Sequence, residues 1–239
     1  MMKEIITGVV IVVFAGACLE SSPESTNVTI KASTVSSTGK TSSNGRIAAN
    51  SVIITDFKIN LSNIKFELDE EDSRHNESPV YEDQKLMGPF QLDLLNPDET
   101  LNQTIASLDI PSGVYEKVEV RFDNSATGTE LAGKTYVIKG TIDGVPFICW
   151  SDEDTKIELD FENAQVDVVA NGDALITNIK ISIDALLARF TELAKAGTLK
   201  DTDGDGVIEI TTENDDDNRS LGREVKGLLE TECHIDDKD

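Results

Sequence analysis

From residue 51 onwards, large apolar residues alternate with polar ones, and this alternation constrains the fold more than any other feature of the chain. In residues 57–61 the apolar positions are odd-numbered, whereas in residues 64–68 they are even-numbered. Alternation with a period of two is typical of strands with one buried face and one solvated face. The change of phase predicts a bulge or bend at Ser62-Asn63.

Further alternating segments follow at short intervals, separated by turn signals. Asp143-Gly144 favours a two-residue hairpin turn, and a second hairpin is expected across Asn171-Gly172. Many short strands with regular turns predict a mainly β protein, an antiparallel β-sandwich of the Ig-like or transthyretin-like kind, over residues 50–183. The expected strands cover residues 90–94, 114–122, 135–142, 145–150, 157–161, 166–168 and 175–183.

The last part of the chain has a helical pattern. Apolar residues at helical spacing predict a helix that Asp184 caps and Gly197 ends. A weaker pattern predicts a second helix over residues 219–229. With the acidic loop between them, the two helices are expected to form a C-terminal helix–loop–helix appendage over residues 184–239.

The N-terminal segment resembles a bacterial lipoprotein signal. Lys3 precedes an apolar run that ends in Ala15-Gly16-Ala17-Cys18 and is too short to span a bilayer. Residues 1–17 are therefore expected to be a signal peptide, and Cys18 to carry the lipid that anchors the protein in the cell envelope, at the outer membrane or cell surface. An ordinary secretory signal and an uncleaved anchor are the alternatives. Residues 18–49, rich in Ser and Thr, are expected to be a flexible tether.

Charge and cysteine content limit the partners. The formal charge of −24 argues against nucleic acid and against electrostatic docking to anionic lipid, and suits divalent cations or a basic protein partner. If Cys18 carries lipid, Cys149 and Cys233 remain. An exported location permits a disulfide between them. Two free thiols are the alternative.

The segment Asp201-Thr202-Asp203-Gly204-Asp205-Gly206-Val207-Ile208-Glu209 resembles the loop of EF-hand and dockerin-type calcium sites. Calcium takes six to eight oxygen ligands, and a sharp turn at Gly206 lets alternating carboxylates converge on one ion. The twelfth position, an acidic residue in those families, is Thr212, so Glu213 or Asp215 is expected to substitute. A solvated acidic turn is the alternative. The expected metal ligands are Asp201, Asp203, Asp205, the carbonyl of Val207, Glu209 and Glu213.

No motif in the chain indicates catalysis, so no catalytic residue is expected. His75 and His234 are not near a serine in a strained turn, and there is no glycine-rich phosphate loop. The expected function is a non-catalytic binding or structural role, with calcium as cofactor. One alternative is a carbohydrate-binding or adhesin module for a polysaccharide, with Trp150 and Tyr136 as a sugar platform. The other is a carboxylate-dependent glycoside hydrolase.

A Leu-x-x-Pro-x-Gly-x-Tyr pattern, formed by Leu108, Pro111, Gly113 and Tyr115, leads into an expected strand. It is similar to a pattern in exported bacterial β-sandwich domains of unknown function, and the resemblance covers about residues 51–183. It implies a sandwich fold and an exported location. It implies no activity, because none is established for those domains.

Overall fold

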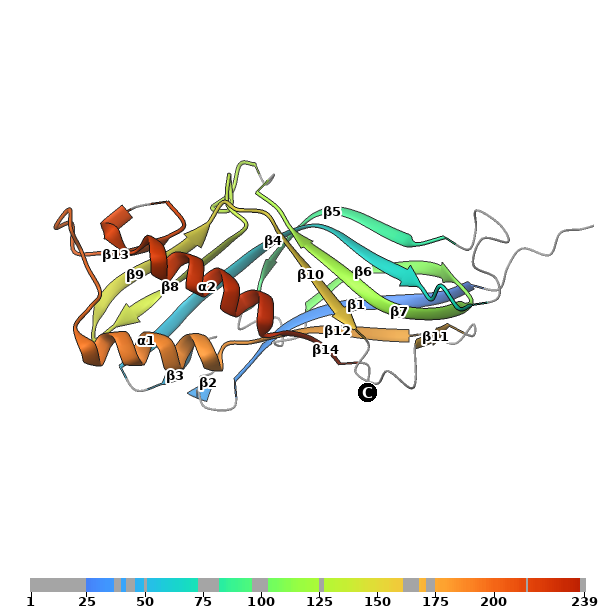
Figure 1. Cartoon of the computed structure of the whole chain (residues 1–239), viewed down its shortest axis with the longest axis horizontal. Helices are drawn as coiled ribbons and strands as arrows, with labels where there is room; N and C mark the ends of the chain where they lie inside the picture. The colour runs from blue at the N-terminus through green and yellow to red at the C-terminus, as the bar shows by residue number, and fades with distance from the viewer. Residues whose placement is uncertain are drawn as a thin grey trace, which may run out of the picture.

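The computed structural model describes residues 25–36, 40–41, 46–49, 51–72, 82–95, 103–124, 127–160, 168–170, 175–213 and 215–236. These residues form two β-sheets and two α-helices in an elongated molecule (Figure 1). The predicted fold class, a mainly β sandwich with C-terminal helices, is confirmed. Neither described helix is long and apolar enough to cross a membrane.

The smaller sheet has four strands in the order β14-β12-β1-β6. β1 lies in its interior, parallel to β12 and antiparallel to β6. The strands are β1 (Ser25–Val35), β6 (Gln103–Pro111), β12 (Leu175–Ser182) and β14 (Cys233–Asp236).

The larger sheet has ten strands and is built around β4, which runs through both halves of the molecule. Its main order is β10-β7-β4-β8-β9-β13, with β5 and β3 also on β4, β2 on β3, and β11 on β7. The strands are β2 (Lys40–Thr41), β3 (Ile47–Ala49), β4 (Val52–Leu68), β5 (Gln84–Asp93), β7 (Gly113–Phe122), β8 (Tyr136–Ile142), β9 (Val145–Ser151), β10 (Thr155–Asp160), β11 (Val168–Ala170) and β13 (Ile208–Thr211).

Two local predictions about these strands are confirmed. The register of β4 against both β5 and β7 shifts between Leu61 and Asn63, which is the predicted bulge. Asp143 and Gly144, both with positive φ, form the turn of the β8–β9 hairpin. The bulge lets one strand turn its apolar side toward the core on both sides of the bend.

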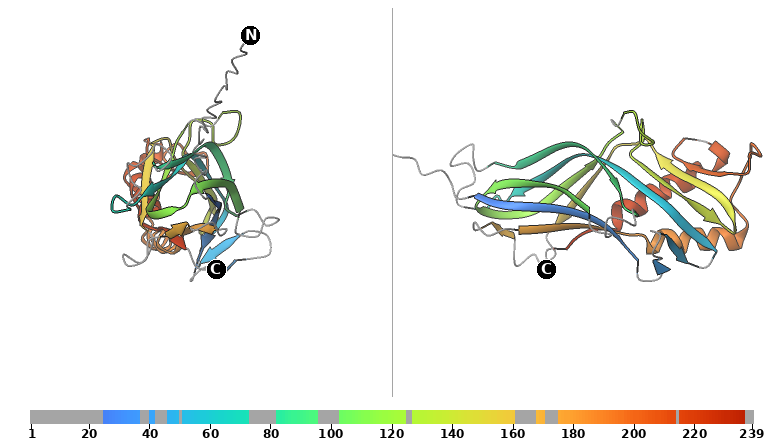
Figure 2. Two further views of the ribbon diagram at one scale, coloured as in Figure 1. Left: turned by 90° about the vertical axis from the view of Figure 1, so that its right-hand side faces the viewer. Right: turned by 180° about the vertical axis from the view of Figure 1, so that it is seen from behind.

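The two sheets enclose one apolar core. β5 approaches β6 and β10 approaches β14, so the edges of the sheets come together (Figure 2). At the other end of the molecule, α1 (Asp184–Ala196) and α2 (Arg219–Thr231) cover the larger sheet. The Phe190 ring of α1 meets the Phe147 ring of β9 edge-on, with centroids 5.1 Å apart. As predicted, α1 ends at Gly197, whose φ is 61°. Asp184 is the first helical residue, however, and makes no cap.

The Pro-x-Gly-x-Tyr segment joins β6 to β7. The hydroxyl of Tyr115, which is fully buried, donates to the carbonyl oxygen of Pro111 at 3.0 Å. Its ring stands edge-on to Phe66. The hydrogen bond closes the turn and gives the buried hydroxyl an acceptor.

The prediction of a flexible tether over residues 18–49 is wrong for residues 25–35, 40–41 and 47–49, which form β1, β2 and β3. Val28, Ile30 and Ala32 point into the core and are fully buried. This stretch has the same period of two as the later strands, but the many Ser and Thr residues around it obscured the pattern. The signal peptide, Cys18 and residues 19–24, 37–39 and 42–45 of the predicted tether lie outside the described residues.

Two other predictions are corrected by the strand pairing. β11 pairs with β7, and β12 with β1 and β14, so among the described residues β11 and β12 do not form the hairpin expected between residues 166–168 and 175–183. The C-terminal helices are present, but strands of the same region belong to both sheets. β13 pairs with β9, and β14 pairs with β12, so residues 184–236 are built into the sandwich.

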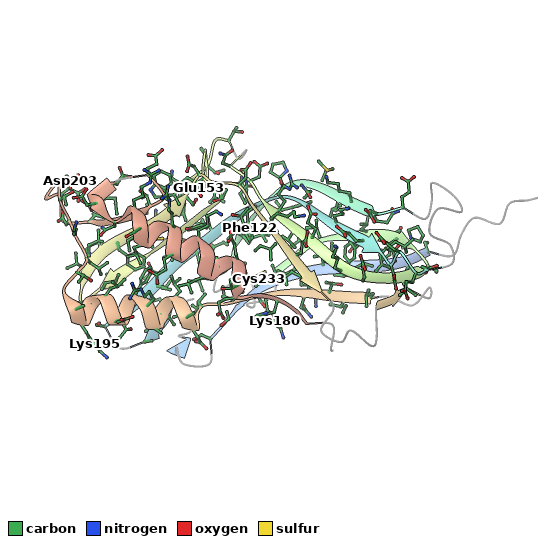
Figure 3. All side chains as sticks on the ribbon, viewed as in Figure 1. Phe122, Glu153, Lys180, Lys195, Asp203 and Cys233 are labelled. Carbon is green, nitrogen blue, oxygen red and sulfur yellow. The ribbon has the colours of Figure 1, made fainter. Side chains whose placement is uncertain are left out.

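The predicted disulfide is also absent. Cys149 and Cys233 are free, buried thiols. Cys149 lies in the larger sheet, on β9. Cys233, which is labelled in Figure 3, lies in the smaller sheet, on β14, at the end of α2. Burial raises the pKa of Cys149, and it raises that of Cys233 to about 12. Both therefore stay protonated and act as small apolar core residues.

Candidate metal site

The acidic loop lies at the end of the molecule that carries the helices, between α1 and β13 (Figure 3). β13 runs parallel to β9, with Ile208 opposite Phe147 and Ile210 opposite Cys149. These apolar side chains are buried, so Glu209 between them faces outward. The loop is therefore fixed to the outer face of the larger sheet.

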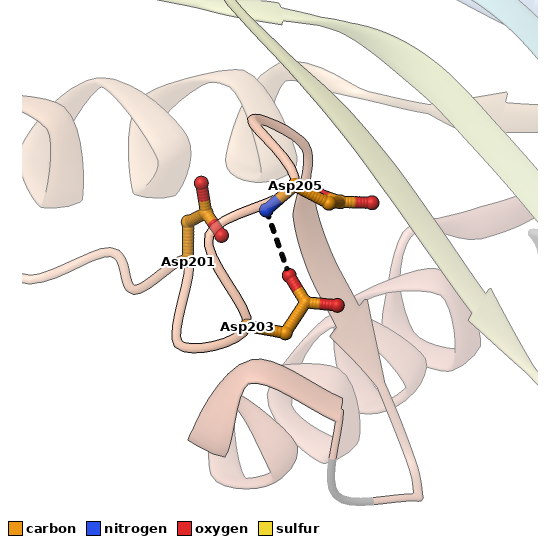
Figure 4. A group of neighbouring side chains, drawn as sticks. All are labelled: Asp201, Asp203 and Asp205. Carbon is orange, nitrogen blue, oxygen red and sulfur yellow. Dashed lines mark hydrogen bonds between the residues drawn. The ribbon is translucent and has the colours of Figure 1, made fainter.

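The loop folds around its own carboxylates. The two oxygens of Asp201 accept the N–H groups of Gly204 and Gly206, at 2.8 and 3.0 Å. Both glycines have positive φ, 75° and 88°, which other residues rarely adopt. Asp203 accepts the N–H of Asp205 at 3.0 Å (Figure 4). These turns bring the three aspartates to one side of the loop.

Two groups of three carboxylates have oxygens within 4.8 Å of one another. The first is Asp201, Asp203 and Asp205, and the second is Asp203, Glu209 and Asp216. Two oxygens on opposite sides of a calcium ion, each about 2.4 Å from it, are separated by roughly this distance. Asp203 belongs to both groups. The structure therefore brings together Asp201, Asp203, Asp205 and Glu209 of the predicted ligands.

Asp216 is the residue that sequence reasoning missed. Its side chain is buried, and it accepts the N–H of Thr202 at 2.6 Å and that of Glu209 at 2.9 Å. It lies in the short 3₁₀ turn η1 (Asp215–Asp217), where its φ of 53° folds the chain back toward the loop. No regular spacing indicates this position, because the return passes through β13 before η1.

Glu213, predicted to be a ligand, belongs to neither group and is exposed. Thr212, at the twelfth position, is buried, and its hydroxyl bonds to Ser151 and Asp152, both at 3.2 Å. The chain at this point is therefore held against the end of β9. Asp216, and not Glu213, lies with Asp203 and Glu209 in the second carboxylate group. Val207, whose carbonyl oxygen is also a predicted ligand, is half-buried at the end of the loop, just before β13.

The carboxyl groups of Glu209 and Asp216 share a hydrogen bond. This bond and burial raise the pKa of Glu209 to about 7. Burial alone would raise the pKa of Asp216, but hydrogen bonds from the side chain and backbone of Glu209 and from Thr202 lower it to about 2. Without an ion, the pair therefore holds a proton below about pH 7. A cation can replace that proton.

Asn218 ties the site to the start of α2. Its amide donates to the carbonyl oxygens of Lys200 and Glu209, each at 2.9 Å.

Two aromatic residues were predicted to form a sugar platform. Tyr136 is buried in the core and is unsuitable, whereas Trp150 is half-buried on the outer face of β9.

No known protein family, curated protein or solved structure matches this chain.

Proposed function

We propose that this protein is a lipid-anchored component of the bacterial cell envelope with a binding or structural role, and that its acidic loop holds a calcium ion. The observation that carries the calcium proposal is the pair of neighbouring three-carboxylate groups beside the outer face of the larger sheet, with Asp203 common to both. The location rests on the signal-like segment that ends at Cys18.

Calcium fits these donors better than other common ions. Each side chain in the two groups offers a carboxylate oxygen, and calcium accepts six to eight such ligands in irregular geometry. Zinc favours cysteine and histidine, and magnesium requires near-octahedral geometry. The role of the ion would be structural, because it would replace the repulsion among these side chains with shared coordination between the loop and η1.

The opposed pKa values of Glu209 and Asp216 also suit an acid–base pair, as in a glycoside hydrolase. Such enzymes separate their two carboxyl groups by about 5 Å or more to admit the sugar or a water molecule. Here the two groups bond directly to each other. Their contact favours a shared ion over hydrolysis.

Calorimetric titration of residues 19–239 with calcium tests the proposal. We expect one ion per chain, with a Kd of about 10⁻⁴–10⁻³ M, as in extracellular modules. Asp203→Asn removes the carboxylate common to both groups and should weaken binding at least tenfold. Glu213→Gln, which changes an acid outside both groups, is the matched control and should bind as the wild type does. Equal binding by all three proteins would contradict the proposal.

Calcium affinity should depend on pH. Because the pKa of Glu209 is about 7 in the ion-free protein, calcium must displace a proton below that pH. We expect the Kd to rise by up to about tenfold per unit as the pH falls from 7 to 5.5 and to level off above 7.5. Titrations across this range should show the slope in the wild type. Glu209→Gln should bind more weakly and without the slope, and an unchanged slope in that variant would exclude Glu209 as its origin.

The anchor is tested in the bacterium. Wild-type protein should incorporate labelled fatty acid and sediment with membranes, and Cys18→Ser should do neither. Cys149→Ser changes a buried thiol instead and should leave both properties intact. Membrane sedimentation of Cys18→Ser equal to the wild type would refute lipid anchoring.

A further inference from the structure

A pocket of about 470 Å³ opens on the outer face of β9 and β13, beside the acidic loop. This volume falls within the range of small-ligand sites, roughly 300–1,000 Å³. The pocket is lined by Lys134, Ile148, Trp150, Asp203, Glu209, Asp215 and Asp216.

The alternation of β9 builds one wall. Phe147 and Cys149 point into the core, so Ile148 and Trp150 point outward. Trp150 packs on a small second cluster that contains the buried residues Leu131 and Val137. This support fixes the indole on the outer face of the sheet.

The register of β13 places the carboxylates next to this apolar wall. Glu209 lies opposite Ile148 on the neighbouring strand, and Thr211 lies opposite Trp150. Asp215 and Asp216 follow on η1 and line the same pocket. One wall is therefore apolar and aromatic, and the other offers hydrogen-bond acceptors.

Besides the apolar wall and the acceptors, the pocket contains a hydrogen-bond donor, Lys134. The ammonium of Lys134 stands over the Trp150 ring, 5.2 Å from its centre. A pyranose ring has the complementary chemistry, because its C–H face stacks on an indole while its hydroxyls both donate and accept hydrogen bonds. We propose that this pocket binds a neutral sugar residue of a polysaccharide, stacked on Trp150, with its hydroxyls bonded to Lys134 and Asp215.

The charges in the pocket select a neutral ligand. Four acidic residues, Asp203, Glu209, Asp215 and Asp216, line it and oppose a phosphate or a uronic acid. The Lys134 ammonium over the ring repels a basic side chain of a partner, whereas a stacked neutral ring only has to move this flexible ammonium to its edge, where it donates to a hydroxyl. A neutral sugar avoids both conflicts.

This inference deepens the binding role proposed above and rests on it. Asp203, Glu209 and Asp216 belong both to the pocket and to a carboxylate group that fits an ion. A calcium ion there would fix the acidic wall and present open coordination positions to sugar hydroxyls. Calcium and sugar should then strengthen each other's binding by the same factor.

Trp150 is the only tryptophan in the chain, so its fluorescence reports on this pocket alone. The probes are four soluble neutral polysaccharides, a β-glucan, a mannan, a galactan and a xylan, each titrated into residues 19–239 in calcium and in EDTA. We expect a saturable change with at least one of them, and at least fivefold tighter binding in calcium.

Affinity electrophoresis then compares variants that lack the fluorophore. Trp150→Leu should weaken binding at least tenfold, whereas Trp150→Phe, which keeps a stacking face, should stay within about threefold. Met87→Ala removes an apolar side chain that is 65% exposed on β5, away from the pocket, and should bind like the wild type. Circular dichroism confirms that each variant is folded.

The outcomes separate this inference from the calcium proposal. Trp150-dependent binding that is equal in calcium and EDTA would keep the sugar site and remove the ion from it. Calcium binding by calorimetry, with no saturable response to any of the four polysaccharides, would overturn the sugar site alone. Sugar binding that Trp150→Leu leaves unchanged, or a saturable response to hexalysine in place of the sugars, would also overturn it.

Discussion

A chain that begins at residue 37 is expected not to fold, although it keeps every strand that the sequence pattern predicts. Its deletion removes β1, which lies between β12 and β6 in the smaller sheet. The core loses Val28, Ile30 and Ala32, all fully buried, and β12 and β6 lose their shared partner. Each buried Val or Ile contributes about 1.5–3 kcal/mol. With the lost strand pairing, the deficit is comparable to the whole stability of a typical domain, about 5–15 kcal/mol.

The measurement is circular dichroism and thermal unfolding of residues 37–239 beside residues 19–239. Only the longer protein should melt cooperatively. A graded comparison uses point variants within β1. Ile30→Ala should cost about 2–5 kcal/mol, whereas Thr29→Ala, at a position on the other face of the strand, should cost below about 1 kcal/mol. Cooperative unfolding of residues 37–239 at the temperature of the longer protein would show that β1 is dispensable.

Gly222→Ala is expected to destabilise the protein strongly, and Gly227→Ala on the same helix to stabilise it. A Cβ at Gly222 would overlap the carbonyl group of Thr211 at the end of β13, so α2 would have to move away from the strand. Forced shifts of this kind cost about 1–3 kcal/mol or more. A Cβ at Gly227 meets nothing within 4 Å, and replacing an open helical glycine with alanine gains about 0.8–1 kcal/mol.

Urea unfolding of both variants beside the wild type tests this pair. The opposite signs make the test specific, because both substitutions add one methyl group to the same helix. Gly222→Ala should also weaken calcium binding, since Thr211 lies between Glu209 and Asp216, and Gly227→Ala should not. Equal effects of the two substitutions on unfolding would contradict the packing of α2 against β13.

Much of the fold could be predicted from residues that act locally. The bulge at Ser62-Asn63 follows from a change of phase, and the β8–β9 turn follows from Asp143-Gly144. Strand pairing is non-local, and the pattern cannot reveal it. The pattern does not indicate that β11 pairs with β7, or that β1 joins β12 in parallel across more than a hundred residues.

The residues of the candidate site likewise fall into those that local spacing predicts and those that depend on non-local pairing. Asp201, Asp203, Asp205 and Glu209 follow a spacing set by a single turn, so their convergence could be predicted. Asp216 could not, because the chain reaches it only after β13 has docked on β9 and η1 has turned back. Trp150 was one of several strand aromatics in the sequence. Its place in the pocket depends on the pairing of β13 with β9, which puts Glu209 beside Ile148, and the sequence does not indicate this pairing.

The melting temperature of residues 19–239, measured in calcium and in EDTA, tests the central claim most directly. A ligand present at a hundred times its Kd and bound only by the folded state stabilises that state by about 2.7 kcal/mol. For a chain of this length we expect a rise of roughly 5–10 °C in calcium. The rise should fall to about half or less in Asp203→Asn and remain in Glu213→Gln. A melting temperature unchanged by calcium, or raised equally in Asp203→Asn, would contradict a calcium ion in the acidic loop.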